Sequence, residues 1–425
     1  MKKIIILSPH FPPSNLAAVH RTRLFAQHLP DFGWDPIVVT VHENFYEEAL
    51  DWNLAKLIPN WLRVEKVNAV PIKKNKIVGD IGLRGFWGLY KRTLKIVREE
   101  NVAFLYIPIP SNYSSLIGRL VNNKTGIPYG IDYIDPWVHN WPEAEIKFSK
   151  AWISKQLANI LEPIAVKKVQ LITGVASGYY ESVLERNPHL KLQTITAAMP
   201  YGGEERDYEL LSALELQPYL FSKTKGTLDF VYGGAMLPKA YSVLEQILQT
   251  IAANKEIFLN CRFHFIGTGK SPNDDTGYNI MPYAEKYGLW QKNVFEYPKR
   301  IPYLDVLTHL SIADGAFILG STEAHYTPSK VYQSVLSKKP VFAVLHKKST
   351  ACSVITKSKA GMVLSFDGEA DLELIGTNFK EYWEDYLKLI TTFNPDEVDK
   401  TSFEEYSAKN VTKILAIALD KIINR

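Results

Sequence analysis

Short, continuous runs of apolar residues alternate along this chain with longer segments of helical periodicity. The first elements show the rhythm, with an apolar run over residues 4–7, a helical pattern over residues 17–29 and a second run over residues 36–41. Runs that are apolar at every position, rather than at every second one, are typical of parallel strands that helices cover on both faces. The pattern therefore predicts an α/β protein assembled from βαβ units.

The same rhythm restarts in the second half, after a polar and turn-rich stretch. Further strands are predicted over residues 102–107, 129–133 and 171–175 in the first half, and over residues 227–232, 261–266, 294–297, 315–319 and 340–345 in the second. Because 425 residues exceed the size at which one hydrophobic core usually stops growing, we expect two domains. We predict two Rossmann-like domains that face a cleft, with the boundaries 1–205 for the N-terminal domain, 206–226 for a linker, 227–395 for the C-terminal domain and 396–425 for a C-terminal helix. By analogy with chains of this architecture, that helix is expected to return to the N-terminal domain.

Composition narrows the class of protein further. Hydrophobic residues make up 46% of the chain and charged residues 22%, which is ordinary for a folded protein. The net charge of +4 is too small for this length to indicate a nucleic-acid partner. Only Cys261 and Cys352 are present, without metal-like spacing, so a reducing compartment fits. The first apolar run is too short for a signal peptide and no stretch is long enough to span a bilayer, so we expect a cytoplasmic protein, with the inner face of the membrane as a further option.

Loops that follow strands are the first places to search for function, because ligands of open parallel sheets bind beyond the carboxyl ends of the strands. After the first strand, prolines that include Pro13 stiffen the loop, and Arg21 comes early in the next helix. Backbone N–H groups at a helix start, together with a guanidinium, suit an anionic or polyhydroxyl ligand. A rigid turn with surface arginines is the alternative interpretation.

A second loop, DYIDPWVHNW, brings Asp135, Trp137 and His139 close together in sequence. Carboxylate and imidazole groups hydrogen-bond to sugar hydroxyls, and an indole ring offers a platform for the apolar face of a sugar. The alternative is a turn in which Asp135 caps the backbone and the tryptophans are buried.

Two glycine loops follow strands in the second half, within FVYGGAMLPKA and FHFIGTGK. The glycines at Gly233, Gly234, Gly267 and Gly269 would let the backbone approach a diphosphate, and Lys239 would neutralise its charge. Neither loop matches a complete dinucleotide or P-loop fingerprint, so each one alone is also explained by a plain turn.

The segment STEAHYTPSKVYQSVLSKKPVFAVL is the most informative part of the chain. Pro328 stands at the threshold of a helix predicted over residues 330–337, whose first turn presents the Ser329 hydroxyl and the Lys330 ammonium group. These groups and the free N–H groups of the first turn suit a phosphate. Helix capping would explain Ser329 alone.

Taken in this order, the motifs resemble the retaining nucleotide-sugar glycosyltransferases of the GT-B fold, in the class often called family 4. The resemblance covers nearly the whole chain and rests on FPP, LPDFGWDPIVVTV, DYIDPW, ITGVASGYYESVL, FVYGG, FHFIGTG, SIADGAFIL and PSKVYQSVLSKKPVFAV. It implies that the C-terminal domain binds a nucleotide-sugar donor and the N-terminal domain a saccharide or lipid-linked acceptor. The implied reaction is sugar transfer with retention, in surface polysaccharide or glycolipid synthesis of the bacterial type.

The resemblance also implies roles for individual residues. Lys239 and Lys330 would stabilise the leaving diphosphate, while Asp135 and His139 would orient the acceptor. The other implied contacts are Gly233, Gly234, Gly267, Gly269, His325, Tyr326, Pro328, Ser329 and Gln333 with the donor, Glu323 or His325 with the transferred sugar, and Pro13, Arg21 and Trp137 on the acceptor side. No metal or other cofactor is implied, because no DxD-like carboxylate pair lies in a suitable loop.

The chain departs from the family pattern at two places. Gly234 and Ala235 occupy the stretch in which the family usually has an arginine. Of the family's paired glutamates, Gln333 replaces the second, and His325 stands at the first with Glu323 nearby. Because a glutamine keeps its hydrogen bonds but loses the charge, a catalytically degenerate binding or scaffold subunit is the alternative function. An epimerase or phosphorylase of the same architecture is a further one.

Residues 66–98 carry nine Lys or Arg residues against one acid, Asp80. Aromatic and aliphatic residues, among them Trp87 and Tyr90, are interleaved with these charges. Such a segment suits an anionic lipid surface near a lipid-linked acceptor, although a solvated helix face explains it equally well.

Overall fold

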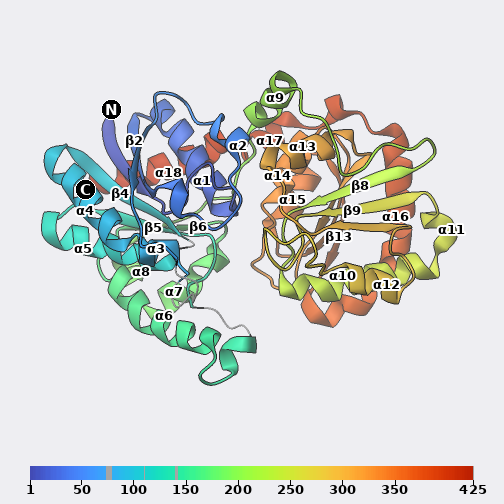
Figure 1. Ribbon diagram of the computed structural model, residues 1–425, viewed down its shortest axis with the longest axis horizontal. Helices are drawn as coiled ribbons and strands as arrows, with labels where there is room; N and C mark the ends of the chain where they lie inside the picture. The colour runs from blue at the N-terminus through green and yellow to red at the C-terminus, as the bar shows by residue number, and fades with distance from the viewer. Residues whose placement is uncertain (73–78, 110, 139–141, 425) are drawn as a thin grey trace. The chain divides into compact units, whose positions relative to one another are not determined.

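The computed structural model describes residues 1–72, 79–109, 111–138 and 142–424 (Figure 1). The chain divides into two compact units, of which unit 1 comprises Met1–Tyr201 and Ala408–Arg425, and unit 2 comprises Gly202–Ser407. Each unit contains one parallel sheet with helices on both faces. The predicted α/β architecture of two Rossmann-like parts is therefore confirmed.

Unit 1 is built on a seven-stranded sheet in the order β3-β2-β1-β4-β5-β6-β7, in which all neighbours are parallel. Its strands are β1 (Lys2–Leu7), β2 (Trp34–Val41), β3 (Arg63–Val67), β4 (Val102–Ile109), β5 (Tyr129–Tyr133), β6 (Leu171–Gly174) and β7 (Ile195–Ala198). Its helices are α1 (Ala17–His28), α2 (Trp52–Ala55), α3 (Ile81–Arg84), α4 (Phe86–Glu99), α5 (Ser115–Thr125), α6 (Lys150–Val166), α7 (Glu181–Arg186), α8 (Leu190–Gln193) and α18 (Ala408–Ile423).

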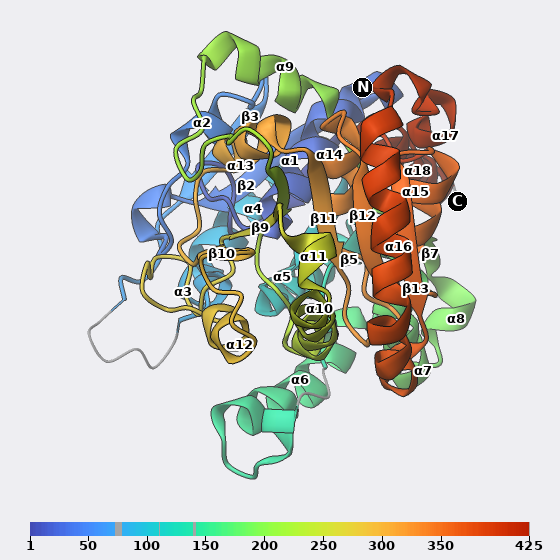
Figure 2. The same ribbon diagram turned by 90° about the vertical axis from the view of Figure 1, so that its right-hand side faces the viewer.

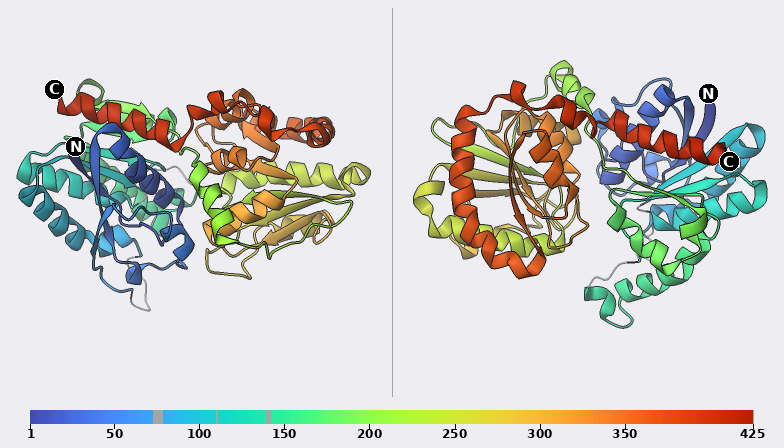
Figure 3. Two further views of the ribbon diagram at one scale, coloured as in Figure 1. Left: turned by 90° about the horizontal axis from the view of Figure 1, so that it is seen from above. Right: turned by 180° about the vertical axis from the view of Figure 1, so that it is seen from behind.

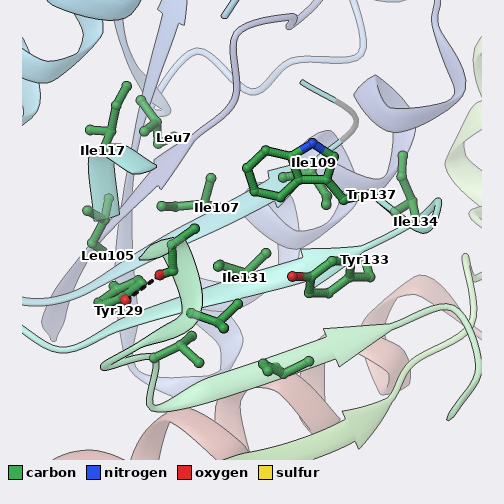
Figure 4. Close-up of a cluster of buried hydrophobic side chains, with 14 of the residues drawn as sticks. Leu7, Leu105, Ile107, Ile109, Ile117, Tyr129, Ile131, Tyr133, Ile134 and Trp137 are labelled. Atoms are coloured by element: carbon green, nitrogen blue, oxygen red, sulfur yellow. Dashed lines mark hydrogen bonds between the residues drawn. The ribbon is translucent and has the colours of Figure 1, made fainter. Parts of the chain in front are cut away.

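The first strand shows why the apolar runs are continuous. Ile5 and Leu7 enter the core on one face of the sheet, which α4 and α5 cover, whereas Ile4 and Ile6 enter the core on the other face, which α1 and α18 cover. Because successive side chains of a strand point to opposite faces, a strand buried on both sides is apolar at every position. Figure 4 shows part of the first core, where Leu7 lies near Ile107 and Ile117.

The C-terminal helix α18 belongs to unit 1, as predicted. Its Val411, Leu415 and Leu419 lie in the same buried cluster as Ile4 and Ile6 of the first strand. Figure 3 shows this helix, in red, along the blue N-terminal elements of the unit. The last turns of the chain thus complete the hydrophobic core that its first residues begin.

Unit 2 is built on a six-stranded parallel sheet in the order β10-β9-β8-β11-β12-β13. Its strands are β8 (Leu228–Gly233), β9 (Cys261–Ile266), β10 (Val294–Tyr297), β11 (Gly315–Leu319), β12 (Val341–His346) and β13 (Gly361–Phe366). Its helices are α9 (Glu205–Leu214), α10 (Tyr241–Ala253), α11 (Lys255–Phe258), α12 (Met281–Lys286), α13 (Tyr303–Ile312), α14 (Lys330–Leu336), α15 (Thr350–Lys357), α16 (Leu372–Thr392) and α17 (Lys400–Glu404). The core is aromatic: Trp383 of α16, the long helix in Figure 2, lies with its ring centroid 4.8 Å from that of Phe230 and 5.0 Å from that of Phe342.

The domain boundaries differ from those predicted. The first unit ends at Tyr201, and residues 206–226 belong to unit 2 instead of forming a linker. Helix α9 packs against α13, the Tyr208 hydroxyl donates to the Gln333 carbonyl, and the backbone N–H of Tyr219 donates to Nε2 of His309. The polar composition that indicated a linker supplies hydrogen bonds within the unit. At the other end, α17 belongs to unit 2, and only α18 returns to unit 1.

Three strands that the apolar runs did not predict, β3, β7 and β13, lie at sheet edges. In β3, Arg63 pairs with Glu100, and Glu65 pairs with Arg92. Charged side chains are a common protection of edge strands against pairing with other chains, and they hide the strand pattern.

Among the described residues, no helix is long and apolar enough to cross a membrane.

Candidate functional site

The carboxyl edge of the unit 2 sheet gathers most of the predicted donor residues. The sheet order changes direction between β8 and β11, and the crevice at such a point is where open α/β sheets bind ligands. Gly233 ends β8, Gly267 follows β9 directly, and Lys330 begins the helix after β11. The fold therefore brings together three loops that lie far apart in the sequence.

The two glycine loops run close together at this edge. Gly234 has φ +102° and Gly267 has φ +73°, values that favour glycine over other residues. A β-carbon placed on Gly267 would lie 3.9 Å from Cα of Gly234, and one placed on Gly234 would lie 3.9 Å from Nζ of Lys330. The absent side chains thus leave a strip of bare backbone beside an ammonium group, an arrangement that suits an anion.

Buried contacts hold the second glycine loop in place. The Glu296 carboxylate of β10 accepts hydrogen bonds from the Thr268 hydroxyl and from the backbone N–H groups of Asn279, Ile280 and Met281. A β-carbon on Gly269 would lie 2.6 Å from Cβ of Pro298, so the loop packs against the next strand exit without room for a side chain. Gly269 therefore has a packing role.

Lys330 has an unusual environment for a lysine. Its Nζ lies 3.5 Å from the ring centroid of Tyr232 and donates to the Ala235 carbonyl at 3.4 Å. Within the described residues no carboxylate pairs with it. Burial lowers the pKa of Lys330 well below its usual value. A partly buried cation that no carboxylate of these residues pairs with is well suited to bind a phosphate.

A second cationic residue reaches this edge from β10. The Cα of Arg300 lies 3.6 Å from the position of a β-carbon on Gly267, and its backbone N–H donates to the Pro272 carbonyl. The sequence pattern showed no arginine after β8, and Arg300 was not a candidate because it follows a different strand. Its nearness to the glycine loop depends on the pairing of β10 with β9.

The loop between β11 and α14 holds the remaining donor candidates. Pro328 is buried, and Ser329 precedes the helix without a capping hydrogen bond from its side chain, so capping does not account for this serine. Glu323 and His325 are partly exposed, and the Tyr326 carbonyl accepts a hydrogen bond from the Ser349 hydroxyl. Helix α14 has only seven residues, so its dipole contributes little and the Lys330 charge matters more.

Gln333 contacts an acid rather than standing alone. Its Nε2 lies 3.4 Å from Oδ2 of Asp207, a fully buried residue of α9, and the Tyr303 hydroxyl donates to the same oxygen at 2.8 Å. Its Oε1 is buried without a hydrogen-bond partner in the described part of the chain. Lys239, by contrast, is exposed on the short 3₁₀ turn Pro238–Ala240, and its carbonyl accepts from Thr322.

In unit 1, Arg21 occupies a buried ion pair. Its Nε and Nη2 donate to the two oxygens of Asp132 at 2.5 and 2.9 Å, and its Nη1 donates to the Pro200 carbonyl at 2.8 Å. Burial alone would lower the pKa of Arg21, but the Asp132 carboxylate holds it above its usual value. Arg21 is therefore neither a surface arginine nor a residue that contacts a ligand, because its guanidinium is fully buried and bonded within unit 1.

The other acceptor-side candidates differ in their placement. Trp137 is 4% exposed and packs against Tyr113 in the core, next to Ile109 in Figure 4, which matches the alternative of a buried indole. Asp135 is exposed, Pro13 is buried with its carbonyl bonded to the Asp51 N–H, and His139 lies outside the described residues.

A cavity of about 220 Å³ lies at the carboxyl edge of the unit 1 sheet. Its lining comes from the segments after β1, β2, β3 and β4, and includes His10, Glu47, Glu48, Asp80, Arg84 and Ser111. Arg84 donates to the carbonyls of Val70 and Phe45, whereas Asp80 accepts from the Ser111 hydroxyl. Three carboxylates against one fully charged base make this cavity acidic.

Glu48 and His10 form a largely buried polar pair in the cavity. Nδ1 of His10 lies 3.0 Å from Oε1 of Glu48, which also accepts a hydrogen bond from the Ser14 hydroxyl. Although burial raises the pKa of Glu48, its contacts with His10 and Ser14 lower it to about 2. Sequence reasoning missed both residues, because the spacing between positions 10 and 48 is not a motif.

The two parallel sheets and their strand order define the class of protein: a two-domain α/β protein of the GT-B fold. Among solved structures, the chain is similar to HepE of Anabaena in complex with UDP and glucose, with 13% identity over 99% of this chain and 100% of that chain and a TM-score of 0.61. It is also similar to sucrose-phosphate synthase of Thermosynechococcus elongatus (12% identity, 100% of both chains, TM-score 0.63) and to a glycosyltransferase from Rickettsia africae (12%, 100% of this chain and 99% of that chain, 0.61). No protein-family model and no curated protein sequence matches the chain.

Proposed function

We propose that this protein is a glycosyltransferase that moves a sugar from a nucleotide-sugar donor, held at the carboxyl edge of the unit 2 sheet, to a saccharide or lipid-linked acceptor. One observation carries the proposal: Lys330, which no carboxylate of the described residues pairs with, lies beside the bare backbone of Gly234 and Gly267. The likeness to HepE, which was solved with UDP-glucose as well as with UDP, supports a uridine nucleotide as the first donor to test.

In this proposal the reaction breaks the bond between the anomeric carbon and the diphosphate, and forms a bond from that carbon to the oxygen of an acceptor hydroxyl, whose proton passes to the leaving diphosphate. Negative charge develops on the leaving diphosphate, so positive groups beside it lower the barrier. Lys330 is suited to this task, with Lys239 and Arg300 as additional positive charges. Transfer with retention, without a metal, remains the expectation from the family resemblance.

The acceptor belongs, in the same proposal, to the cavity of unit 1. Because Glu47, Glu48 and Asp80 line it, an acceptor whose saccharide is neutral or carries an amino group fits better than one with acidic groups at that position. Surface polysaccharide or glycolipid synthesis in the cytoplasm, at the inner face of the membrane, completes the proposed role.

A donor screen tests the proposal. UDP-, GDP- and ADP-sugars are titrated by calorimetry, and turnover with acceptor is followed by NMR, which also reports the anomeric configuration of the product. Transfer with retention of the anomeric configuration supports the proposal in full. Transfer with inversion would contradict only the proposed stereochemistry and would leave the glycosyltransferase assignment in place. If none of the nucleotide sugars binds, the proposal is wrong.

The second candidate function, a binding or scaffold subunit without catalysis, is favoured by one observation: Gln333 is bonded to Asp207 and lacks the charge that the family has there. Tight nucleotide-sugar binding without hydrolysis or transfer would establish it. Sugar interconversion without an acceptor would instead indicate an epimerase.

A further inference from the structure

Helix α6 carries a stripe of apolar side chains that nothing in the described part of the chain covers. Ile153, Leu157, Ile160 and Ile164 follow one another at intervals of four, three and four residues, so they share one face of the helix. They are between 42% and 62% exposed, and Ile146 and Phe148 extend the stripe at 64% and 80%. Apolar residues at this spacing are normally turned toward a core.

The opposite face of α6 already fulfils that core role. Ala158, Ala165 and Val166 are buried in the unit 1 core, and Glu162 is buried in an ion pair with Arg186. Figures 1 and 2 both show α6 at the margin of unit 1. The helix is thus attached through one face and presents a second apolar face outward, and a contiguous exposed patch of this kind marks an interaction surface.

The charges around the stripe have one sign. Lys147, Lys150, Lys155, Lys167 and Lys168 lie on or beside the helix, whereas Glu145 is the one exposed acid within residues 144–168. None of the five lysines is in an ion pair in the described residues. A second copy of the chain docked on the stripe would bring two sets of lysines together, which opposes self-association.

We propose that the apolar stripe of α6, with its lysines, docks on the surface of an anionic lipid bilayer. The helix spans about 25 Å, and it would lie in the plane of the interface with the isoleucines inserted and the lysines at the headgroups. This inference does not depend on the proposed catalytic function.

The segment 66–98 is less suited to the same task. Four of its six described basic residues already pair with acids: Lys66 with Glu43, Arg84 with Glu47, Arg92 with Glu65 and Lys95 with Glu99. Its largest exposed apolar side chain, Trp87, is 64% exposed and tests this alternative surface.

Vesicle co-sedimentation tests the proposal. The full-length protein is mixed with vesicles of equal parts phosphatidylcholine and phosphatidylglycerol, and with phosphatidylcholine vesicles as a reference. We expect binding to the anionic vesicles that weakens as salt rises, since salt screens the lysines. Ile160→Asp combined with Ile164→Asp should reduce that binding at least tenfold, because it places two charges in the inserted stripe.

Leu192→Asp is the matched control, since Leu192 lies in α8 of the same unit and is 95% exposed. It should leave vesicle binding unchanged, and circular dichroism should show that all variants are folded. Loss of binding in Trp87→Asp with full binding in the α6 variant would assign the contact to residues 66–98 and overturn the proposal. Absence of binding to anionic vesicles at low salt would overturn it too, as would a dimer in sedimentation velocity that the α6 variant abolishes.

Discussion

Replacing Lys330 by methionine separates a ligand-binding lysine from a structural one. Methionine keeps most of the length and apolar surface of the lysine stem but removes the ammonium group that lies over Tyr232. Since no carboxylate in the described residues pairs with this ammonium group, the substitution leaves no anion uncompensated. Its effect on binding therefore reports the lysine–ligand interaction directly.

The expected loss of affinity follows from the charges. A hydrogen bond between an ammonium group and a phosphate contributes about 1.5–3 kcal/mol, which corresponds to a roughly tenfold to hundredfold weaker complex when it is removed. The partly buried position of Lys330 beside the Tyr232 ring favours the upper part of that range, because the charge is poorly solvated before the ligand arrives.

Stability should change in the opposite direction. Burial holds the pKa of Lys330 in the folded protein well below the 10.5 of the unfolded chain. In the pH range between the folded and the unfolded pKa, the unfolded chain binds more protons, so the free energy of unfolding rises with pH. Lys330→Met should remove this rise and should leave the melting temperature at pH 7 equal or higher. A structural lysine would show the reverse.

Calorimetric titration with UDP, with thermal melts of the same samples, measures both effects. Lys338→Met is the control, because Lys338 is an exposed lysine just beyond the other end of α14. It should bind UDP like the unmodified protein. Unchanged UDP affinity in Lys330→Met, or a large loss of stability, would refute the reasoning.

Further predictions concern both units. Arg21→Met or Asp132→Asn leaves one buried group without its counter-charge and should cost about 3–5 kcal/mol in urea unfolding, whereas the double variant should cost clearly less than the sum; additive costs would contradict a coupled pair. The folded pKa of Glu48, about 2, lies below its ordinary 4.5, so the stability that it contributes is present above pH 4.5 and is lost as pH falls through about 2. Glu48→Gln should therefore flatten the acid unfolding curve by about 3 kcal/mol, and an unchanged curve would argue against the pair with its histidine. Gln333→Glu should destabilise the protein because it places a second carboxylate beside Asp207, and Asp207→Asn should rescue it in urea unfolding. Sugar transfer should persist in EDTA; its loss, restored by Mg²⁺, would contradict metal-independent catalysis.

The central strands could be predicted from the sequence because burial on both faces imposes one simple rule on every residue. β5 and β11, which have neighbours on both sides, begin and end at the predicted residues for this reason. The edge strand β10 also has its predicted bounds, although only every second residue of it is buried. Edge strands obey a weaker rule, since one of their sides faces solvent. The alternating charges of β3 therefore hid a strand that its pairing with β2 makes plain.

Site residues were harder to predict, because the same chemistry serves ligands and cores. An arginine after a proline loop and a tryptophan after an aspartate suit sugar binding, yet Arg21 bonds to Asp132 and Trp137 packs against Tyr113. Only burial and partners distinguish the two uses, and neither is visible in a sequence. The position of Lys330 at the carboxyl edge could be predicted because it depends on a local feature, a helix start after a strand, whereas Arg300 and Glu48 reach the sheet edges through strand pairing and loop packing.

The glutamine at position 333, where the resemblance leads one to expect a glutamate, is explained differently once its neighbour Asp207 is considered. In the sequence, Gln333 appears as a lost charge, since the resemblance leads one to expect a carboxylate at that position. In the structure, its amide approaches a buried carboxylate that arrives from α9, in a stretch whose composition indicated a linker. A glutamate at 333 would repel Asp207, so the two residues are compatible only when one of them is neutral. Variants of Gln333 and Asp207 must therefore be interpreted as a pair.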